Sequence, residues 1–194
     1  VSLANTFREC EAFNDSRVSN WDMSSVSALS GFFINCFKLN IPVQKWNLDN
    51  CLIFTSTFMN CKSFNQNLND WDIAGTSNLV NRKIAKDISL NFKQMFDGAT
   101  SFNRTLSSWP SKIKYFYNNR NTVFEKKITS TYKVRNIINH DVGSTPKWVN
   151  CDNMFQNCEN LKLLSMSEWN NIPKYATIVN MLKNTKNSPK QPRI

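Results

Sequence analysis

Six cysteines and one histidine are the residues of this chain best suited to nucleophilic or metal chemistry. No two cysteines share a Cys-x-x-Cys spacing, and His140 has no cysteine near it in the sequence, which argues against a zinc site. With four glycines in all, the chain also has no glycine-rich phosphate loop. We therefore predict no catalytic residue, no metal site and no cofactor, and we predict that the chain is not an enzyme.

The spacing of the cysteines shows that most of them belong to an internal repeat. Three residues before each cysteine of the repeat stands a phenylalanine, and ten or eleven residues after it stands a tryptophan. The repeat slots are Phe7, Cys10 and Trp21; Phe33, Cys36 and Trp46; Phe58, Cys61 and Trp71; Phe96, Ala99 and Trp109; and Phe155, Cys158 and Trp169. Self-similarity of this kind determines the fold before any local pattern does.

Two slots of the repeat allow a structural and a chemical interpretation. Interchange of cysteine with Ala99 indicates a small buried site, so we favour free thiols that act as small apolar groups over disulfides. The tryptophans could form an exposed platform that stacks on sugars or bases. An apolar residue three positions before each of them favours a buried row instead.

The period of the repeat points to a stack. Cys36 follows Cys10 by 26 residues and Cys61 follows Cys36 by 25, which is too short for one unit to bury its own apolar face. Phe54, Phe58 and Cys61 have helical spacing, and the segment 68–73 has the alternation of a short strand. We therefore predict an α/β repeat fold, a solenoid of about five 25-residue units with a short strand and a helical turn in each.

The repeat also sets the domain organisation. We predict a single repeat domain over 1–185, a short insertion at 80–91, a longer basic and aromatic insertion at 110–149 and a flexible tail at 186–194. The pattern restarts at 178–182, which indicates a partial sixth unit or a cap.

The repeat resembles that of BspA-like leucine-rich-repeat surface proteins. The nearest subtype is a repeat of unknown function from mycoplasma lipoproteins, which also occurs in protists and large DNA viruses. The fullest matching unit contains Phe58, Cys61, Phe64, Asn65, Gln66, Trp71 and Asp72. The resemblance covers about 1–79, 92–109 and 151–185, and the Asp after the Trp is replaced by Asn47, Pro110 and Asn170 in three units. It implies a leucine-rich-repeat-like solenoid used for surface display or adhesion and not for catalysis.

Positive charge is concentrated between the third and fifth units. Residues 81–150 carry 13 Lys and Arg against 4 Asp and Glu, whereas residues 1–80 carry 5 against 7. Insertions of repeat proteins often form the binding face, so the partner-binding candidates are Lys112, Lys114, Tyr115, Tyr117, Arg120, Lys126, Lys127, Lys133 and Arg135. Basic residues among aromatics can bind nucleic acid. No nucleic-acid recognition motif accompanies them, so we favour a protein partner with an acidic surface.

Two function classes fit these features. The first is a binding or display module at a cell surface or in the secreted state. The second is a structural subunit of a virion or other large particle, docked through its basic insertion. No apolar run approaches the roughly 18 residues of a transmembrane helix, and the sequence contains no recognisable signal peptide.

Overall fold

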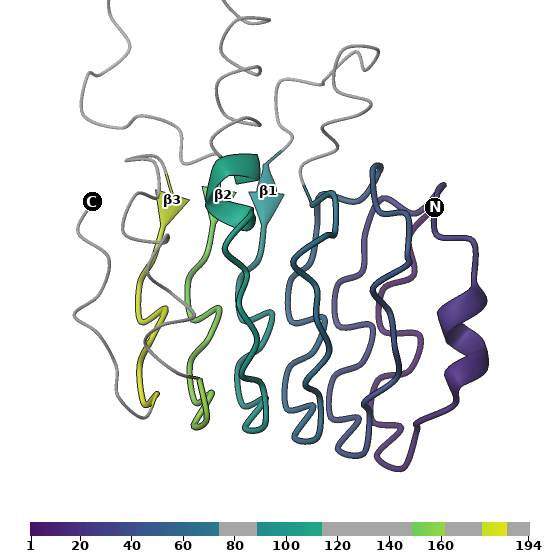
Figure 1. The fold of residues 1–194 in the computed structure, drawn as a ribbon, viewed down its shortest axis with the longest axis horizontal. Coiled ribbons are helices and arrows are strands. Elements are labelled where there is room, and N and C mark those ends of the chain that lie inside the picture. The colour runs from purple at the N-terminus through teal and green to yellow at the C-terminus, as the bar shows by residue number, and fades with distance from the viewer. Residues whose placement is uncertain (74–88, 114–148, 162–175, 186–194) are drawn as a thin grey trace, which may run out of the picture.

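The computed structural model describes residues 1–73, 89–113, 149–161 and 176–185. Its named elements are the 3-10 helix η1 (Ser16–Asn20) and the strands β1 (Leu90–Asn91), β2 (Val149–Asn150) and β3 (Ala176–Thr177). The strands form one parallel sheet in the order β1-β2-β3. Single-residue parallel bridges continue this row through Asn91, Ile53, Ala28 and Ser2. Segments far apart in the sequence therefore lie side by side, as a row of stacked coils (Figure 1).

Each coil leaves its bridge residue and enters a run of six turn residues. The runs are 4–9, 30–35, 55–60, 93–98, 152–157 and 179–184. The second and the last residue of every run have positive φ: Asn5 and Glu9, Gly31 and Asn35, Ser56 and Asn60, Gln94 and Gly98, Asn153 and Asn157, and Asn180 and Asn184. Positive φ at the third position of a four-residue turn is the mark of a type II turn, and Gly and Asn adopt it at the lowest cost.

These turns occupy the place of the helical turn that the sequence predicts, so that local prediction is wrong. In an α-helix each amide would bond to the carbonyl four residues back. Here the Phe58 amide donates to the Met95 carbonyl of the next coil at 2.8 Å. The left-handed residues interrupt helical winding, yet Phe54, Phe58 and Cys61 all remain on the inner side and are 0% exposed.

The short strand predicted for 68–73 is also wrong in its position. Trp71 N donates to Leu68 O at 3.2 Å within a turn, and no residue of this segment pairs as a strand. Parallel pairing in the same coil lies at Ile53, between Ala28 and Asn91. The Trp and its apolar partner are inward-facing because the turn brings both to one side of the coil.

Backbone hydrogen bonds join neighbouring coils, and all those between the turn runs point the same way. Between the second and third coils, the amides of Leu29, Gly31, Phe33 and Asn35 donate to the carbonyls of Ile53, Thr55, Thr57 and Met59, at 2.8, 2.8, 3.0 and 3.0 Å. The same slots are joined at every described junction. Within the turn runs, each coil therefore turns amides toward the coil that follows it and carbonyls toward the coil that precedes it.

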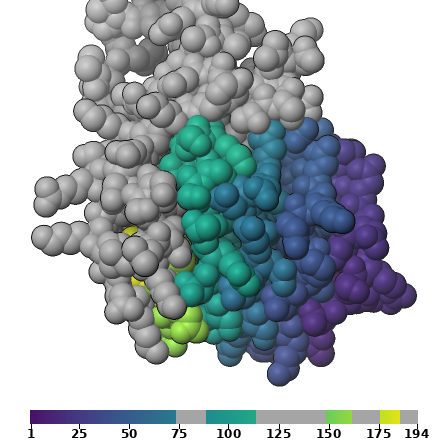
Figure 2. All heavy atoms as spheres, viewed as in Figure 1, coloured from purple at the N-terminus to yellow at the C-terminus, as the bar shows by residue number. Residues whose placement is uncertain are grey.

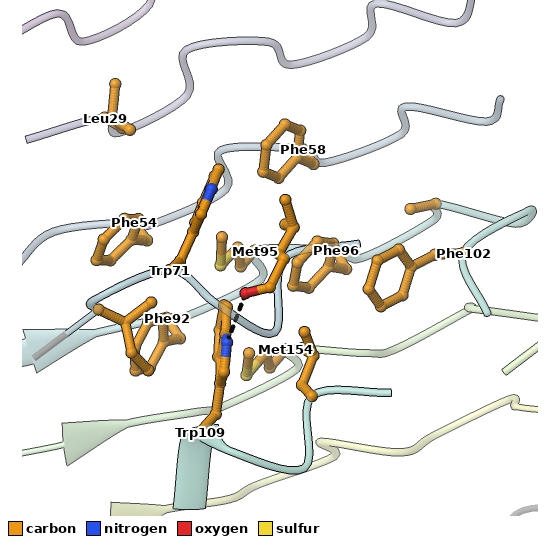
Figure 3. Close-up of a cluster of buried hydrophobic side chains, with 14 of the residues drawn as sticks. Leu29, Phe54, Phe58, Trp71, Phe92, Met95, Phe96, Phe102, Trp109 and Met154 are labelled. Atoms are coloured by element: carbon orange, nitrogen blue, oxygen red, sulfur yellow. Dashed lines mark hydrogen bonds between the residues drawn. The ribbon is translucent and has the colours of Figure 1, made fainter. Parts of the chain in front are cut away.

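A ladder of stacked aromatic rings fills the inside of the coils (Figure 3). Ring centroids lie 5.8 Å apart for Phe33 and Phe58, and 5.6 Å apart for both Phe58 and Phe96 and Phe96 and Phe155. These four rings are 0% exposed. Such pairs contribute about 0.5–1.5 kcal/mol each beyond the burial of their area. Each of these coils therefore adds one ring to the stack in the core.

Six coils are present in the described residues. The last is formed by β3 and the turn run after it, and Phe155 N of the fifth coil donates to Met181 O at 2.9 Å. The insertion boundaries also differ from those expected. Leu90 and Asn91 of β1, and Val149 of β2, belong to the stacked coils and not to the insertions at 80–91 and 110–149.

Candidate functional site

Both insertions interrupt the coils at one edge of the stack. The described chain breaks between Ile73 and residue 89 for the first insertion, and between Ile113 and Val149 for the second. Leu90 pairs in parallel with Val149, so the two points of return are neighbours. A helical segment over 109–113 lies beside β1 and β2 at the same end of the coils (Figure 1). We call this edge the insertion rim.

The two points of departure are joined through Lys112. Its Nζ donates to the carbonyl of Asn69 at 2.9 Å and to that of Trp71 at 2.8 Å. Ser108 N adds a bond of 2.9 Å to Asn69 Oδ1. The beginning of the second insertion is therefore fixed to the chain that leads into the first.

Lys112 has a structural role that was not predicted from the sequence. Its ammonium group is occupied by two backbone carbonyls, although we predicted it as a partner-binding residue. Burial lowers the pKa of Lys112, and the carboxylates of Asp72 and Asp70 oppose that shift. The other predicted partner-binding residues lie outside the described residues: Lys114, Tyr115, Tyr117, Arg120, Lys126, Lys127, Lys133 and Arg135.

We expect Lys112→Met to destabilise the protein by about 1–3 kcal/mol, because two backbone carbonyls lose a charged donor while the aliphatic stem is kept. Urea unfolding of the purified chain measures the change. The matched control is Lys45→Met, since Lys45 is exposed and should change stability by no more than about 0.5 kcal/mol. Equal stability of the two variants would show that Lys112 does not hold the rim together.

The cysteine slot forms a row of inward hydrogen bonds. The Sγ atoms of Cys36, Cys61 and Cys158 each donate to the carbonyl of the aromatic slot one coil earlier, at 3.0 Å in all three cases. Burial raises the pKa of Cys36 to about 12 and raises the pKa values of Cys61 and Cys158 as well. These thiols are held protonated and out of solvent, so they serve packing and not nucleophilic chemistry.

The tryptophan slot is buried in the interior coils. Trp46, Trp71 and Trp109 are 4%, 1% and 0% exposed. Their Nε1 atoms donate to a carbonyl of the preceding coil at 3.2, 2.9 and 2.9 Å. Trp21 differs from this expectation because it is 42% exposed in the first coil. Trp169 lies outside the described residues.

Polar residues near the tryptophans shape turns. Asp22 Oδ1 accepts from Ser24 N at 2.9 Å, and Asn47 Oδ1 accepts from Asp49 N at 3.1 Å. Asp and Asn make this local bond equally well, which explains why they interchange in the repeat. The described residues contain no group of three or more His, Cys, Asp or Glu side chains arranged to hold a metal ion.

Sequence reasoning overlooked the asparagines of the turn runs. They form cross-coil pairs such as Asn60 Nδ2 to Asn35 Oδ1 at 2.9 Å and Asn157 Nδ2 to Asp97 Oδ1 at 2.9 Å. A Cβ on Gly98 would lie 2.2 Å from Asn60 Oδ1, so a side chain in that slot of the fourth coil would require Asn60 to move. The signal available in the sequence was an Asn or Gly directly before the cysteine slot in most units.

No helix among the described residues has the length and hydropathy needed to cross a membrane.

Comparison with known proteins gives a family but no individual relative. No curated protein and no solved structure matches the chain. One family description matches over residues 1–131 and again over 89–192. Because these matches cover most of the sequence, the chain belongs to the family described as Mycoplasma protein of unknown function, DUF285.

Proposed function

We propose that this protein is a non-catalytic binding module, a leucine-rich-repeat-like solenoid that presents its basic insertions on one rim to the acidic surface of a protein partner. The resemblance of the repeat to that of BspA-like surface proteins supports a role in adhesion or display at a cell surface or in the secreted state. The observation that carries the proposal is the convergence of both insertions on the insertion rim.

The convergence supports binding because two basic segments start from the same edge of the stack. Residues 74–88 contain Arg82, Lys83 and Lys86 against one acidic residue, Asp87. The residues between 113 and 149 add the predicted partner-binding cations. Charges of one sign that start from adjacent points on a rigid scaffold raise the local potential and attract an acidic partner.

The described part of the scaffold supports the proposal because its thiols are used for packing. The Sγ atoms of Cys36, Cys61 and Cys158 donate to backbone carbonyls inside the stack. Because the cysteines and tryptophans of the repeat are used for packing, we infer that the inserted segments bind the partner.

The test is a charge comparison at the rim. We expect replacement of Lys114, Arg120, Lys126, Lys127 and Lys133 by Gln to abolish binding to immobilised polyglutamate and to flatten its dependence on salt, because screening acts on exposed charge. The measurement is binding to polyglutamate at two salt concentrations, with pull-down from extracts of the source organism's cell surface in parallel.

The matched control removes the same number of charges elsewhere on the stack. It replaces the exposed lysines Lys38, Lys45, Lys62, Lys93 and Lys183 by Gln. The two variants have equal net charge, so a difference between them reports location. Equal loss of binding in both would attribute the effect to overall charge and would contradict a site on the insertion rim.

A further inference from the structure

The loops that follow the turn runs form an edge of their own. In the fourth coil, β1 and the helical segment over 109–113 both lie at the insertion rim, so the loop between them lies at the other end of the coil (Figure 1). The equivalent loops of the second, third and fourth coils are 36–41, 61–66 and 99–104. We call this edge the loop edge. In the space-filling view, the lower ends of the blue and teal coils belong to the surface (Figure 2).

Asparagine side chains join these loops and leave their amide nitrogens open. Asn65 N donates to Asn40 Oδ1 at 3.0 Å, and Asn103 N donates to Asn65 Oδ1 at 3.0 Å. These bonds occupy the amide oxygens of Asn40 and Asn65. The Nδ2 atoms of the same two residues donate to no acceptor among the described residues. The ladder therefore fixes an amide donor in each of two successive coils.

Arg104 is held in the same ladder with the tip of its guanidinium group open. Its Nε donates to Asn65 O at 2.7 Å, in the slot where Gln66 Nε2 donates to Asn40 O at 2.7 Å one coil earlier. The two terminal nitrogens of Arg104 donate to no described acceptor, and the residue is exposed. Because Nε anchors the side chain, little conformational freedom is lost when the planar fork binds a carboxylate or a sulfate.

Two lysines extend the positive charge along the loop edge. Lys38 and Lys62 are exposed, and Lys62 Nζ lies over the Phe37 ring at 4.5 Å from its centroid. The three loops contain no Asp or Glu. The ion pairs among the described residues include neither of these lysines nor Arg104. The three positive charges are therefore available to an anion from solvent.

We propose that the loop edge binds an acidic polysaccharide, a linear sugar chain that carries carboxylate or sulfate groups. The open groups of the edge are donors: two amide nitrogens, a guanidinium fork and two ammonium groups. Donors that recur from one coil to the next suit a chain whose anionic and hydroxyl acceptors also recur along its length. The edge lies away from the insertion rim, so the inference is independent of the proposed binding function.

The chemistry of the loop edge favours a polysaccharide over other polyanions. Protein partners bind through aromatic and apolar anchors, and none of the exposed large apolar side chains of the described residues lies in these loops. Single-stranded nucleic acid stacks its bases on open aromatic rings. Phe64 and Phe102 are buried, and Lys62 lies over the half-buried ring of Phe37. Neither kind of anchor is therefore offered to a protein or a nucleic acid.

Heparin, a sulfated polysaccharide, is the probe. We expect the loop-edge variant, with Lys38→Gln, Lys62→Gln and Arg104→Gln, to bind immobilised heparin about tenfold more weakly than the unchanged protein. A change of about tenfold corresponds to the loss of one charge-assisted hydrogen bond. Glutamine at position 104 keeps the bond to the preceding coil, because Gln66 makes the same bond in the third coil.

The matched control replaces the same number of exposed lysines outside these loops, Lys45, Lys93 and Lys183, by Gln. It should bind heparin nearly as tightly as the unchanged protein. Both variants lose three charges and both retain the insertions, so a difference between them reports the loop edge alone.

Asn65→Asp tests the amide donor separately. Aspartate keeps the Oδ1 acceptor for Asn103 N and replaces Nδ2 by a carboxylate oxygen. The control Asn47→Asp adds the same charge in a turn where Asp22 makes the equivalent bond one coil earlier. We expect Asn65→Asp to weaken heparin binding more than Asn47→Asp does, and thermal melting checks that both variants remain folded.

Equal heparin binding by the loop-edge variant and its control overturns the proposal, and so does equal binding by the two aspartate variants. Failure of the unchanged protein to bind heparin overturns it as well. Polyuridylate and polyglutamate are measured in parallel. If the loop-edge substitutions weaken binding to either of these more than binding to heparin, the edge belongs to a nucleic acid or an acidic protein, and the proposal is likewise overturned.

Discussion

Trp71→Ala should lower the free energy of unfolding by about 3–5 kcal/mol, the range of large core truncations. The Trp71 ring is 1% exposed and lies 6.2 Å from Trp46 and 6.1 Å from Phe58 between ring centroids. Its Nε1 donates to the buried carbonyl of Val43 at 2.9 Å, and alanine would leave that carbonyl without this donor. The substitution therefore removes ring packing from two coils and a hydrogen bond between them.

Guanidinium unfolding followed by circular dichroism measures this loss. The matched control is Trp21→Ala, which removes the same side chain at the same repeat slot where it is 42% exposed. We expect a smaller cost there, on the order of 1 kcal/mol, because much of the ring already contacts water. An equal cost for both substitutions would show that position in the stack does not determine the contribution of this slot.

Phe96→Ala should also cost about 3–5 kcal/mol, and its effect should extend to the coils on both sides. Phe96 stacks on Phe58 at 5.6 Å, on Phe155 at 5.6 Å and on Phe102 at 4.3 Å. The fourth coil has Ala99 where its neighbours have cysteine, so its junction with the third coil lacks the thiol bond that Cys36, Cys61 and Cys158 make to the coil before them. We therefore expect the fourth coil to fill poorly the cavity that the lost Phe96 ring leaves.

Hydrogen exchange on the Phe96→Ala variant locates the damage. The Phe58 amide donates from the third coil to the fourth, and the Asn153 amide donates from the fifth coil to the sixth. We expect both amides to lose protection from exchange. The control Phe37→Ala affects a half-buried ring that contacts Lys62 on the outside of the coils. Protection lost only at the mutated residue would contradict the coupling between neighbouring coils.

The slots of the repeat could be predicted from the sequence because apolar residues recur at positions that the fold buries. Phe33, Phe58 and Phe96 were identified in this way, and so was the restart that became the sixth coil. The path of the backbone between the slots could not be predicted. Helical spacing and a run of type II turns place Phe54 and Phe58 on the same inner side, and only the left-handed residues distinguish them.

The candidate site was predictable in part. Composition indicated that the insertions carry the charge, and the described ends of both lie on one rim. The role of Lys112 was not predictable, because its carbonyl partners at Asn69 and Trp71 are about 40 residues away in the sequence. Such a long-range contact has no local signature, so Lys112 resembled the other basic residues of the insertion.

One continuous ladder of backbone hydrogen bonds joins the coils. Native-state hydrogen exchange tests it most directly at the amides of Phe33, Phe58 and Phe96, which donate to the next coil at 3.0, 2.8 and 2.9 Å. We predict that all three exchange only through cooperative unfolding, with similar free energies of protection. Exchange of these three amides at the rate of unprotected backbone would contradict a continuous ladder between the coils.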